Sequence, residues 1–216
     1  MSAEAEEHHD APAKLSLVRW VATAEGDAAL VEAVRRGDER AHTEVYARHA
    51  PHVQRVLIRC LGDPGEVADA LQEVFIEVFR SLGRLRDPAS LRAWITKIAV
   101  FVARARIRRR RRWRWLTFVT PDALPDVVAP DADEDLRAAL RAVYVILDLL
   151  DTDDRIAFVL RHVDGMALRE VAAACDCSVA TIKRRLARGQ ATFAAHAAEE
   201  PLLHAWLGST TSWRDS

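Results

Sequence analysis

Apolar residues recur along this chain at helical spacing, and no stretch shows the sustained alternation that predicts a β-strand. The clearest case runs from Met166 to Phe193, which predicts two short helices joined by a tight turn. The apolar face of the first helix comprises Leu168, Val171, Ala172 and Cys175, and the buried stripe of the second comprises Val179, Ile182, Leu186 and Phe193. The turn is placed at Asp176, because aspartate tolerates a left-handed backbone, and Ser178 is the expected N-cap that follows it.

The second helix of this pair has a basic front opposite its apolar back. This front comprises Thr181, Arg184, Arg185 and Arg188, with Lys183 beside them. A helix–turn–helix of this kind suits the DNA major groove, where its first residues meet base edges and its arginines meet phosphates or guanines. An ordinary helical hairpin with a solvated charged face is the alternative at this point.

The rest of the pattern predicts an all-α fold of two small domains. Helices are expected over residues 27–37, from 38 to 51 and onward to 62, over 66–80, and over 90–112. Two more precede Gly165, beginning near residues 135 and 156. Residues 117–134 hold three prolines and five acids without helical periodicity, which indicates a flexible acidic linker. The expected domains are residues 27–116 and 135–198, with extensions at 1–26, partly disordered, and at 199–216.

Two surfaces of the first domain are candidates for binding. The polar side of the helix over residues 66–80 includes one aliphatic residue, and it comprises Asp69, Gln72, Glu73 and Ile76. This mixture favours a protein-docking patch, although a stray surface isoleucine is common. The outer face of the helix over residues 90–112 is predicted to comprise Lys97, Val100, Phe101, Arg104 and Arg108. Cations beside an exposed aromatic ring suit phosphate binding and base stacking. Trp113 and Trp115 interleave the end of this basic run, and packing on the core is favoured for them.

Charge is strongly segregated in a chain of 216 residues whose formal net charge is only −1. Residues 104–114 contain eight arginines, whereas residues 117–135 contain six acids and no basic residue. This asymmetry favours a nucleic-acid partner. Three cysteines fit a reducing compartment, and Cys175 and Cys177 lack a second ligand pair, so neither a metal nor a cofactor is expected. With no signal-peptide pattern and no long apolar run, a cytoplasmic location is expected.

Motifs in both halves resemble one family. The stretch Asp69-Ala70-Leu71-Gln72-Glu73-Val74-Phe75 is similar to a D-x-x-Q-E-x-F core, and residues 164–172 and 178–186 are similar to a region-four helix–turn–helix pattern. Both occur in bacterial RNA polymerase sigma factors of the sigma-70 family, in the extracytoplasmic-function group that has only regions two and four. The resemblance extends from about Ala28 to Ala195.

The resemblance implies a role for each surface. The patch of Asp69, Gln72, Glu73 and Ile76 would dock on the clamp helices of the largest polymerase subunit. The loop containing Arg84, Leu85 and Arg86 would hold a base flipped from the minus-ten element, and Lys97, Val100, Phe101, Arg104 and Arg108 would contact DNA beside it. The second domain would bind the flap of the second-largest subunit and read the minus-thirty-five element with Thr181, Lys183, Arg184, Arg185 and Arg188. An anti-sigma partner is common in this group.

Some positions depart from the family pattern. The family often has asparagine at Phe101, aspartate at Ala105 and glycine at Asp176, which leaves the minus-ten preference open. The segments before Ala28 and after Pro201 are not standard for the group. A helix–turn–helix repressor or activator that acts without polymerase is the main alternative, although it would leave the docking patch unexplained. An enzyme acting on nucleic acids is disfavoured, because no phosphate-binding glycine loop, metal cluster or acid–base pair occurs in the sequence.

Overall fold

The computed structural model describes residues 26–117, 134–201 and 203, apart from the side chains of residues 114–117. Every regular element within these ranges is helical, which confirms the predicted all-α class. The predicted extension up to residue 25, the linker between residues 118 and 133, most of the C-terminal extension and the Trp115 side chain lie outside the described residues.

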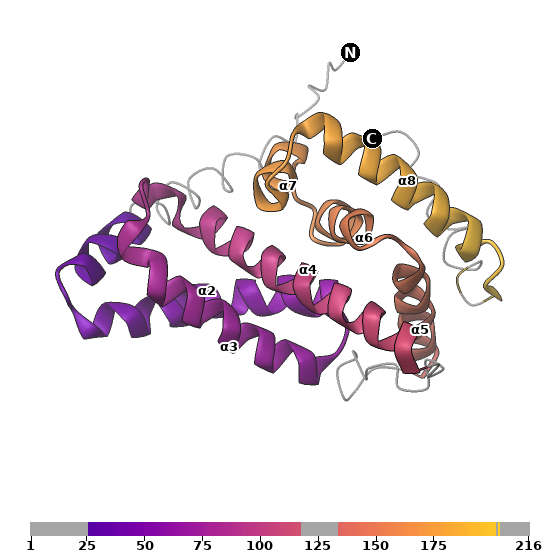
Figure 1. Ribbon diagram of the computed structural model, residues 1–216, viewed down its shortest axis with the longest axis horizontal. Coiled ribbons are helices and arrows are strands. Elements are labelled where there is room, and N and C mark those ends of the chain that lie inside the picture. Colours follow the sequence, from indigo (N-terminus) through magenta and orange to yellow (C-terminus); the bar gives the residue numbers. More distant parts are fainter. Residues whose placement is uncertain (1–25, 118–133, 202, 204–216) are drawn as a thin grey trace, which may run out of the picture.

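The first group of helices contains a helix over residues 26–35, α2 (Glu39–Leu61), α3 (Pro64–Ser81) and α4 (Leu91–Thr117). Short 3-10 turns η1 (Leu82–Arg84) and η2 (Pro88–Ser90) join α3 to α4. In Figure 1, α2 and α3 lie next to each other beneath the long diagonal of α4. The Asp38 carboxylate caps α2 by accepting from the Arg40 amide at 2.9 Å.

The boundary between α2 and α3 depends on a glycine. Gly62 ends α2 with φ of 85°, a left-handed conformation that favours residues without a side chain. The Tyr144 ring packs against it so closely that a Cβ at this position would approach Cδ1 of the ring to 2.7 Å. A side chain at residue 62 would therefore be disfavoured by both the backbone and the neighbouring ring.

The second group contains α5 (Glu134–Leu149), α6 (Thr152–Phe158), the π-helical turn η3 (Val159–Val163), α7 (Leu168–Cys175) and α8 (Val179–Ala197). The turn of the helix–turn–helix is where the pattern predicted it. Asp176 has φ of 55°, and the Ser178 hydroxyl accepts from the Thr181 amide at 3.1 Å. Gly189 is buried where α8 packs against α6, and a Cβ there would lie 3.5 Å from the Asp154 carbonyl oxygen, an ordinary van der Waals contact.

Helix α4 lies between the two groups, which share one continuous apolar core (Figure 1). It packs against α2 and α3 on one side and against α6 and α7 on the other. This explains one wrong expectation: Val100 was placed on the outer face of the helix, but its side chain is 0% exposed. The helical pattern identified the face that packs on the first domain and missed the second packing surface.

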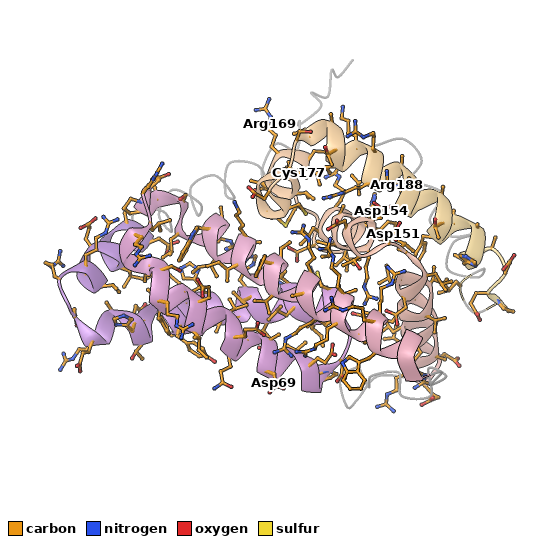
Figure 2. All side chains as sticks on the ribbon, viewed as in Figure 1. Asp69, Asp151, Asp154, Arg169, Cys177 and Arg188 are labelled. Carbon is orange, nitrogen blue, oxygen red and sulfur yellow. The ribbon has the colours of Figure 1, made fainter. Side chains whose placement is uncertain are left out.

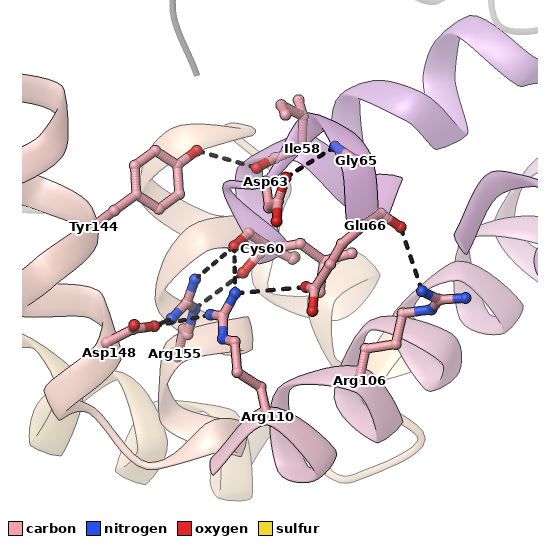
Figure 3. A network of polar contacts seen from close by, with 11 residues as sticks. Ile58, Cys60, Asp63, Gly65, Glu66, Arg106, Arg110, Tyr144, Asp148 and Arg155 are labelled. Atoms are coloured by element: carbon pink, nitrogen blue, oxygen red, sulfur yellow. Dashed lines mark hydrogen bonds and ion pairs between the residues drawn. The ribbon is translucent and has the colours of Figure 1, made fainter. Parts of the chain in front are cut away.

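A polar network joins the two groups (Figure 3). The Arg155 side chain, 1% exposed, donates to the Cys60 carbonyl at 2.9 Å and pairs with Asp148. Arg110 of α4 also pairs with Asp148, at 2.9 Å, and the Tyr144 hydroxyl donates to the Ile58 carbonyl at 3.1 Å. Burial lowers the pKa of Arg155, and the Asp148 carboxylate opposes that shift. The network satisfies carbonyls at the end of α2 with donors from α5 and α6.

Candidate nucleic-acid interface

The four residues of the predicted docking patch lie together on α3 and are all exposed. They line a groove of about 800 Å³ between α3 and α4, whose other wall includes Trp94 and Phe101. Ile76 is 48% exposed and Phe101 is 67% exposed, so the groove presents apolar surface to solvent. Glu73 pairs across the groove with the buried Arg106 at 2.8 Å. Figure 2 shows Asp69 on the side of the molecule away from Arg169 and Arg188.

The loop between α3 and α4 encloses a second, smaller cavity of about 470 Å³. Arg84 and Arg86 line it and are exposed, as expected. Leu85 lines it as well, although its side chain is only 6% exposed and anchors the loop in the core. Arg35 fixes the loop from outside, donating to the Leu85 carbonyl and, at 3.4 Å, to that of Gly83.

The basic face of α4 is partly open and partly covered. Lys97, Phe101 and Arg108 are exposed, whereas Arg104 is only 19% exposed beneath the second domain. Trp113 is 63% exposed, so packing on the core, the favoured interpretation, is wrong for this residue. The predicted face therefore divides into an outer part beside the groove and an inner part beside α6.

The basic front of α8 is where the helical pattern placed it, but two of its arginines contact carboxylates. Lys183 and Arg184 are exposed and Thr181 is half-buried. Arg185 pairs with Asp153 at 3.3 Å, and Arg188 pairs with Asp154 at 2.7 Å, as Figure 2 indicates for the second pair. The Asp154 carboxylate raises the pKa of Arg188, which remains cationic.

The acids of α6 are functional candidates that the sequence interpretation missed. Asp153 contacts Arg104 at 2.7 Å and Arg108 at 3.2 Å, in addition to Arg185. Lys97 similarly pairs with Asp176 at 2.6 Å and lowers the pKa of that carboxyl group. Acids in the first turn of a helix are ordinary, because they favour the positive end of its dipole, so the sequence alone gave no reason to single them out.

Cys60 and Cys175 are buried thiols. Burial raises the pKa of Cys60 to about 12 and that of Cys175 to about 11, so both thiols stay protonated at neutral pH. Within the part of the chain that the structure describes, no group of three His, Cys, Asp or Glu residues could hold a metal ion. In those same residues, no helix is long and apolar enough to cross a bilayer.

Comparisons with known proteins agree with this geometry. Residues 45–113 match the family described as Sigma-70 region 2, and residues 140–191 match Sigma-70, region 4. The chain is 30% identical over 182 residues to the RNA polymerase sigma-H factor of Pseudomonas aeruginosa, covering 78% of this chain and 92% of that protein. It is also 30% identical over 176 residues to the ECF RNA polymerase sigma-E factor of Escherichia coli, covering 76% and 90%.

Solved structures show the same fold. The sigma factor RpoE of Bartonella quintana, in complex with the anti-sigma factor NepR, superposes with a TM-score of 0.57 at 20% identity, over 72% of this chain and 96% of that chain. CnrH in complex with the cytosolic domain of CnrY gives a TM-score of 0.57 at 25% identity, over 81% and 98%. The two family matches and the curated relatives define the chain as a two-domain initiation factor of transcription. This chain belongs to the sigma-70 family, in its extracytoplasmic-function group.

Proposed function

We propose that this protein is a sigma factor that directs core RNA polymerase to specific promoters and initiates transcription there. The observation that carries the proposal is the presence, in one chain, of an exposed docking groove in a region 2 domain and a basic helix–turn–helix in a region 4 domain. A repressor or activator that binds duplex DNA without polymerase would need the basic helix–turn–helix but not the docking groove.

The docking patch of Asp69, Gln72, Glu73 and Ile76 would bind the clamp helices of the largest polymerase subunit. A half-exposed isoleucine at the centre of acids and an amide is the composition of an interface with a small apolar core and a polar rim. The exposed Phe101 ring in the groove adds apolar area for a partner helix to cover. Region 4 would bind the flap of the second-largest subunit.

Promoter recognition would use both domains. Lys183 and Arg184 are exposed near the start of α8, where a recognition helix meets base edges of the minus-thirty-five element. Arg185 and Arg188 would add phosphate or guanine contacts once they leave their carboxylates. In region 2, the cavity beside Arg84 and Arg86 would receive a base flipped from the minus-ten element, while Lys97, Phe101, Arg104 and Arg108 bind the adjacent backbone.

The buried residues of the predicted minus-ten set need a different account. Val100 is buried, so we assign it to packing rather than to contacting DNA, whereas Leu85 lines the cavity proposed to receive the base and would help to shape it. Strand opening would need no nucleotide hydrolysis, because captured bases and new phosphate contacts offset the lost stacking energy. The protein is accordingly proposed to have no enzymatic activity of its own.

An anti-sigma factor is a further proposed partner. The two solved neighbours are sigma factors in complex with NepR and with the cytosolic domain of CnrY. A partner of this kind would cover surfaces that this chain needs for polymerase or DNA. Co-purification of the full chain from its own bacterium, followed by identification of a stoichiometric protein other than polymerase, would reveal it.

The test of function is transcription in vitro with purified bacterial core polymerase and fragmented genomic DNA. We expect discrete, factor-dependent start sites that share two spaced upstream elements. No new start sites, together with tight binding of the protein alone to duplex DNA, would favour a repressor or activator instead. The shared elements would also supply the promoter fragment for the experiments below.

A further inference from the structure

The loop between α3 and α4 is held in place by a side chain from a distant helix. The guanidinium group of Arg35 donates to the Leu85 carbonyl and, from Nε at 3.4 Å, to the Gly83 carbonyl. A planar guanidinium presents its donors in a fixed fork, so one side chain can orient two acceptors at once. Arg35 thus fixes two peptide groups of this loop.

The two carbonyls bonded by Arg35 directly precede the two arginines of the smaller cavity. The Gly83 carbonyl belongs to the peptide group that carries the Arg84 nitrogen, and the Leu85 carbonyl belongs to that of Arg86. Because a peptide group is planar, fixing its carbonyl also fixes the nitrogen of the following residue. Both arginines line the cavity of about 470 Å³ that is proposed to receive a base. The bonds from Arg35 therefore restrict the directions in which Arg84 and Arg86 can point.

The two ends of the same loop are closed by its own residues. The Leu85 amide donates to the Leu82 carbonyl at 3.1 Å where η1 ends. The Asp87 carboxylate caps η2 by accepting from the Ala89 amide at 3.1 Å, and the Ser90 hydroxyl donates to the Asp87 carbonyl at 2.7 Å. The carbonyls in the middle of the loop depend instead on a donor from a distant part of the chain.

The helix that carries Arg35 is anchored well enough to act as a support. Near its start, the buried Asp27 carboxylate lies 3.1 Å from Nε2 of His49 on α2. Glu32 pairs with Arg35 at 2.5 Å, one turn away, and so limits the conformations of that long side chain. The residues that match Sigma-70 region 2 begin only at residue 45, so the match itself assigns no role to this helix.

We propose that Arg35 is a positioning residue for the capture of an unpaired base: it holds the loop so that the cavity and its two arginines are arranged before DNA arrives. The proposal rests on the proposed function, since it takes this cavity to receive a base of the minus-ten element. A loop that is already ordered loses less conformational entropy on binding, and its affinity for the ligand is correspondingly higher. Arg35 acts through the loop and does not itself touch the base.

The test separates affinity for the captured base from affinity for the DNA backbone. Holoenzymes are assembled from core polymerase and full-length wild type, Arg35→Ala or Arg36→Ala, the last removing a neighbouring exposed arginine. A labelled promoter fragment, unpaired over the minus-ten element, carries either its native bases or an abasic site at one position at a time. Fluorescence anisotropy gives the affinities. The position at which the abasic site weakens wild-type binding most marks the captured base.

We expect the Arg35→Ala holoenzyme to bind the native fragment about fivefold to tenfold more weakly than wild type, as a partial loss of one base contact implies. Its affinity for the fragment that lacks the captured base should change by less than about twofold, because the backbone contacts remain. Arg36→Ala should leave both affinities unchanged within the same limit. A phosphate contact or a general loss of stability would weaken both fragments alike, so equal losses in Arg35→Ala would overturn the proposal.

A second variant protects the test against a folding defect. Arg35→Lys keeps the positive charge, but its single ammonium nitrogen does not reproduce the planar fork, so we expect the preference for the native over the abasic fragment to fall about twofold to fourfold. If the alanine variant does not fold, an unchanged preference in Arg35→Lys refutes the positioning role.

Hydrogen exchange of the free full-length proteins distinguishes this failure from a failure of the proposed function. Amides of residues 83–90 should exchange faster in Arg35→Ala than in wild type or Arg36→Ala. Faster exchange, with no base preference in the wild-type holoenzyme, would contradict the function proposed for the cavity while Arg35 would still be shown to support the loop. Unchanged exchange would contradict the positioning role even if the wild-type holoenzyme prefers the native base.

Discussion

The two surfaces that flank α4, the groove toward α3 and the contact with α6, differ in how accessible they are to a partner. The α3–α4 groove exposes Ile76 and Phe101 to solvent, whereas the opposite side of α4 is covered by α6 and its arginines are paired with carboxylates. Exposed apolar area with a polar rim is the mark of a surface that is completed by another protein. Where arginines are already paired with carboxylates of the same chain, an outside partner must compete with those carboxylates to bind them. The same helix thus serves a site that is open and a site that is closed.

The largest loss of stability is expected from a buried charge in the contact between α4 and α6, which we call the closed surface; the α3–α4 groove is the open surface. Arg155→Ala removes the donor to Cys60 and the partner of Asp148, and we expect a loss of about 3 kcal/mol in the free energy of unfolding. Urea denaturation measures it. The matched change on the open surface, Gln72→Ala, should stay within about 0.5 kcal/mol, since Gln72 is exposed. Equal losses would contradict the distinction between the two surfaces.

Acid should weaken the packing of region 2. His52 is buried between Thr96, at 2.8 Å from Nε2, and Arg92, at 3.2 Å from Nδ1. The Thr96 hydroxyl donates to the Arg92 carbonyl, so Nε2 is the donor to Thr96 and Nδ1 accepts from Arg92. Burial, assisted by the Arg92 charge, lowers the pKa of His52 from 6.5 to about 4.

This pKa shift fixes the sign of the pH dependence. The unfolded chain binds the proton more tightly than the folded one, so stability is full above about pH 6.5 and falls as the pH drops toward 4. We expect a loss of about 2 kcal/mol between pH 8 and pH 5 from this residue. In His52→Gln, whose amide can keep both hydrogen bonds, that part of the loss should vanish from urea denaturation curves. An unchanged pH dependence in this variant would contradict the assignment.

The open surface should matter for polymerase and not for stability. Ile76→Glu places a charge at the centre of the proposed interface, and we expect the affinity for core polymerase to fall at least tenfold, or about 1.4 kcal/mol. Ala47→Glu, at an exposed position on α2 that does not line the groove, is the control. Glu73→Lys should also weaken assembly, but it breaks the ion pair with Arg106 and so confounds docking with folding. Normal assembly of the Ile76 variant would refute the docking assignment.

The smallest of these effects is expected at Arg185 of α8, which pairs with Asp153 of α6. Arg185→Ala should reduce discrimination of the upstream element by about fivefold to tenfold, near the lower end for one specific arginine contact, while polymerase affinity is unchanged. Competition between wild-type and scrambled upstream elements in the holoenzyme measures this ratio. If polymerase affinity falls while discrimination of the upstream element stays unchanged, Arg185 contacts polymerase rather than DNA, and the assignment proposed for it is contradicted.

The helix boundaries and the helix–turn–helix could be predicted because local chemistry determines them. The left-handed Asp176, the Ser178 cap and the glycine ends at Gly37 and Gly62 all follow from the conformations that these residues tolerate. The periodic positions of α3 likewise placed the four docking residues on one exposed face.

The error at Val100 and the missed role of Asp153 both have their cause in tertiary packing. Val100 was expected to face outward, but a helix packed on two sides gives no separate signal in the local pattern. The role of Asp153 depends on α4, α6 and α8 meeting in space, although they are distant in the sequence. Local periodicity does not contain that information.

One measurement tests the central claim most directly: binding of a labelled promoter fragment by the protein alone, by core polymerase alone and by their mixture. We predict that only the mixture gives a sequence-specific complex with an opened minus-ten region, detected by the reactivity of unpaired thymines toward permanganate. Tight, sequence-specific binding by the protein alone, unchanged when polymerase is added, would contradict its role as a sigma factor.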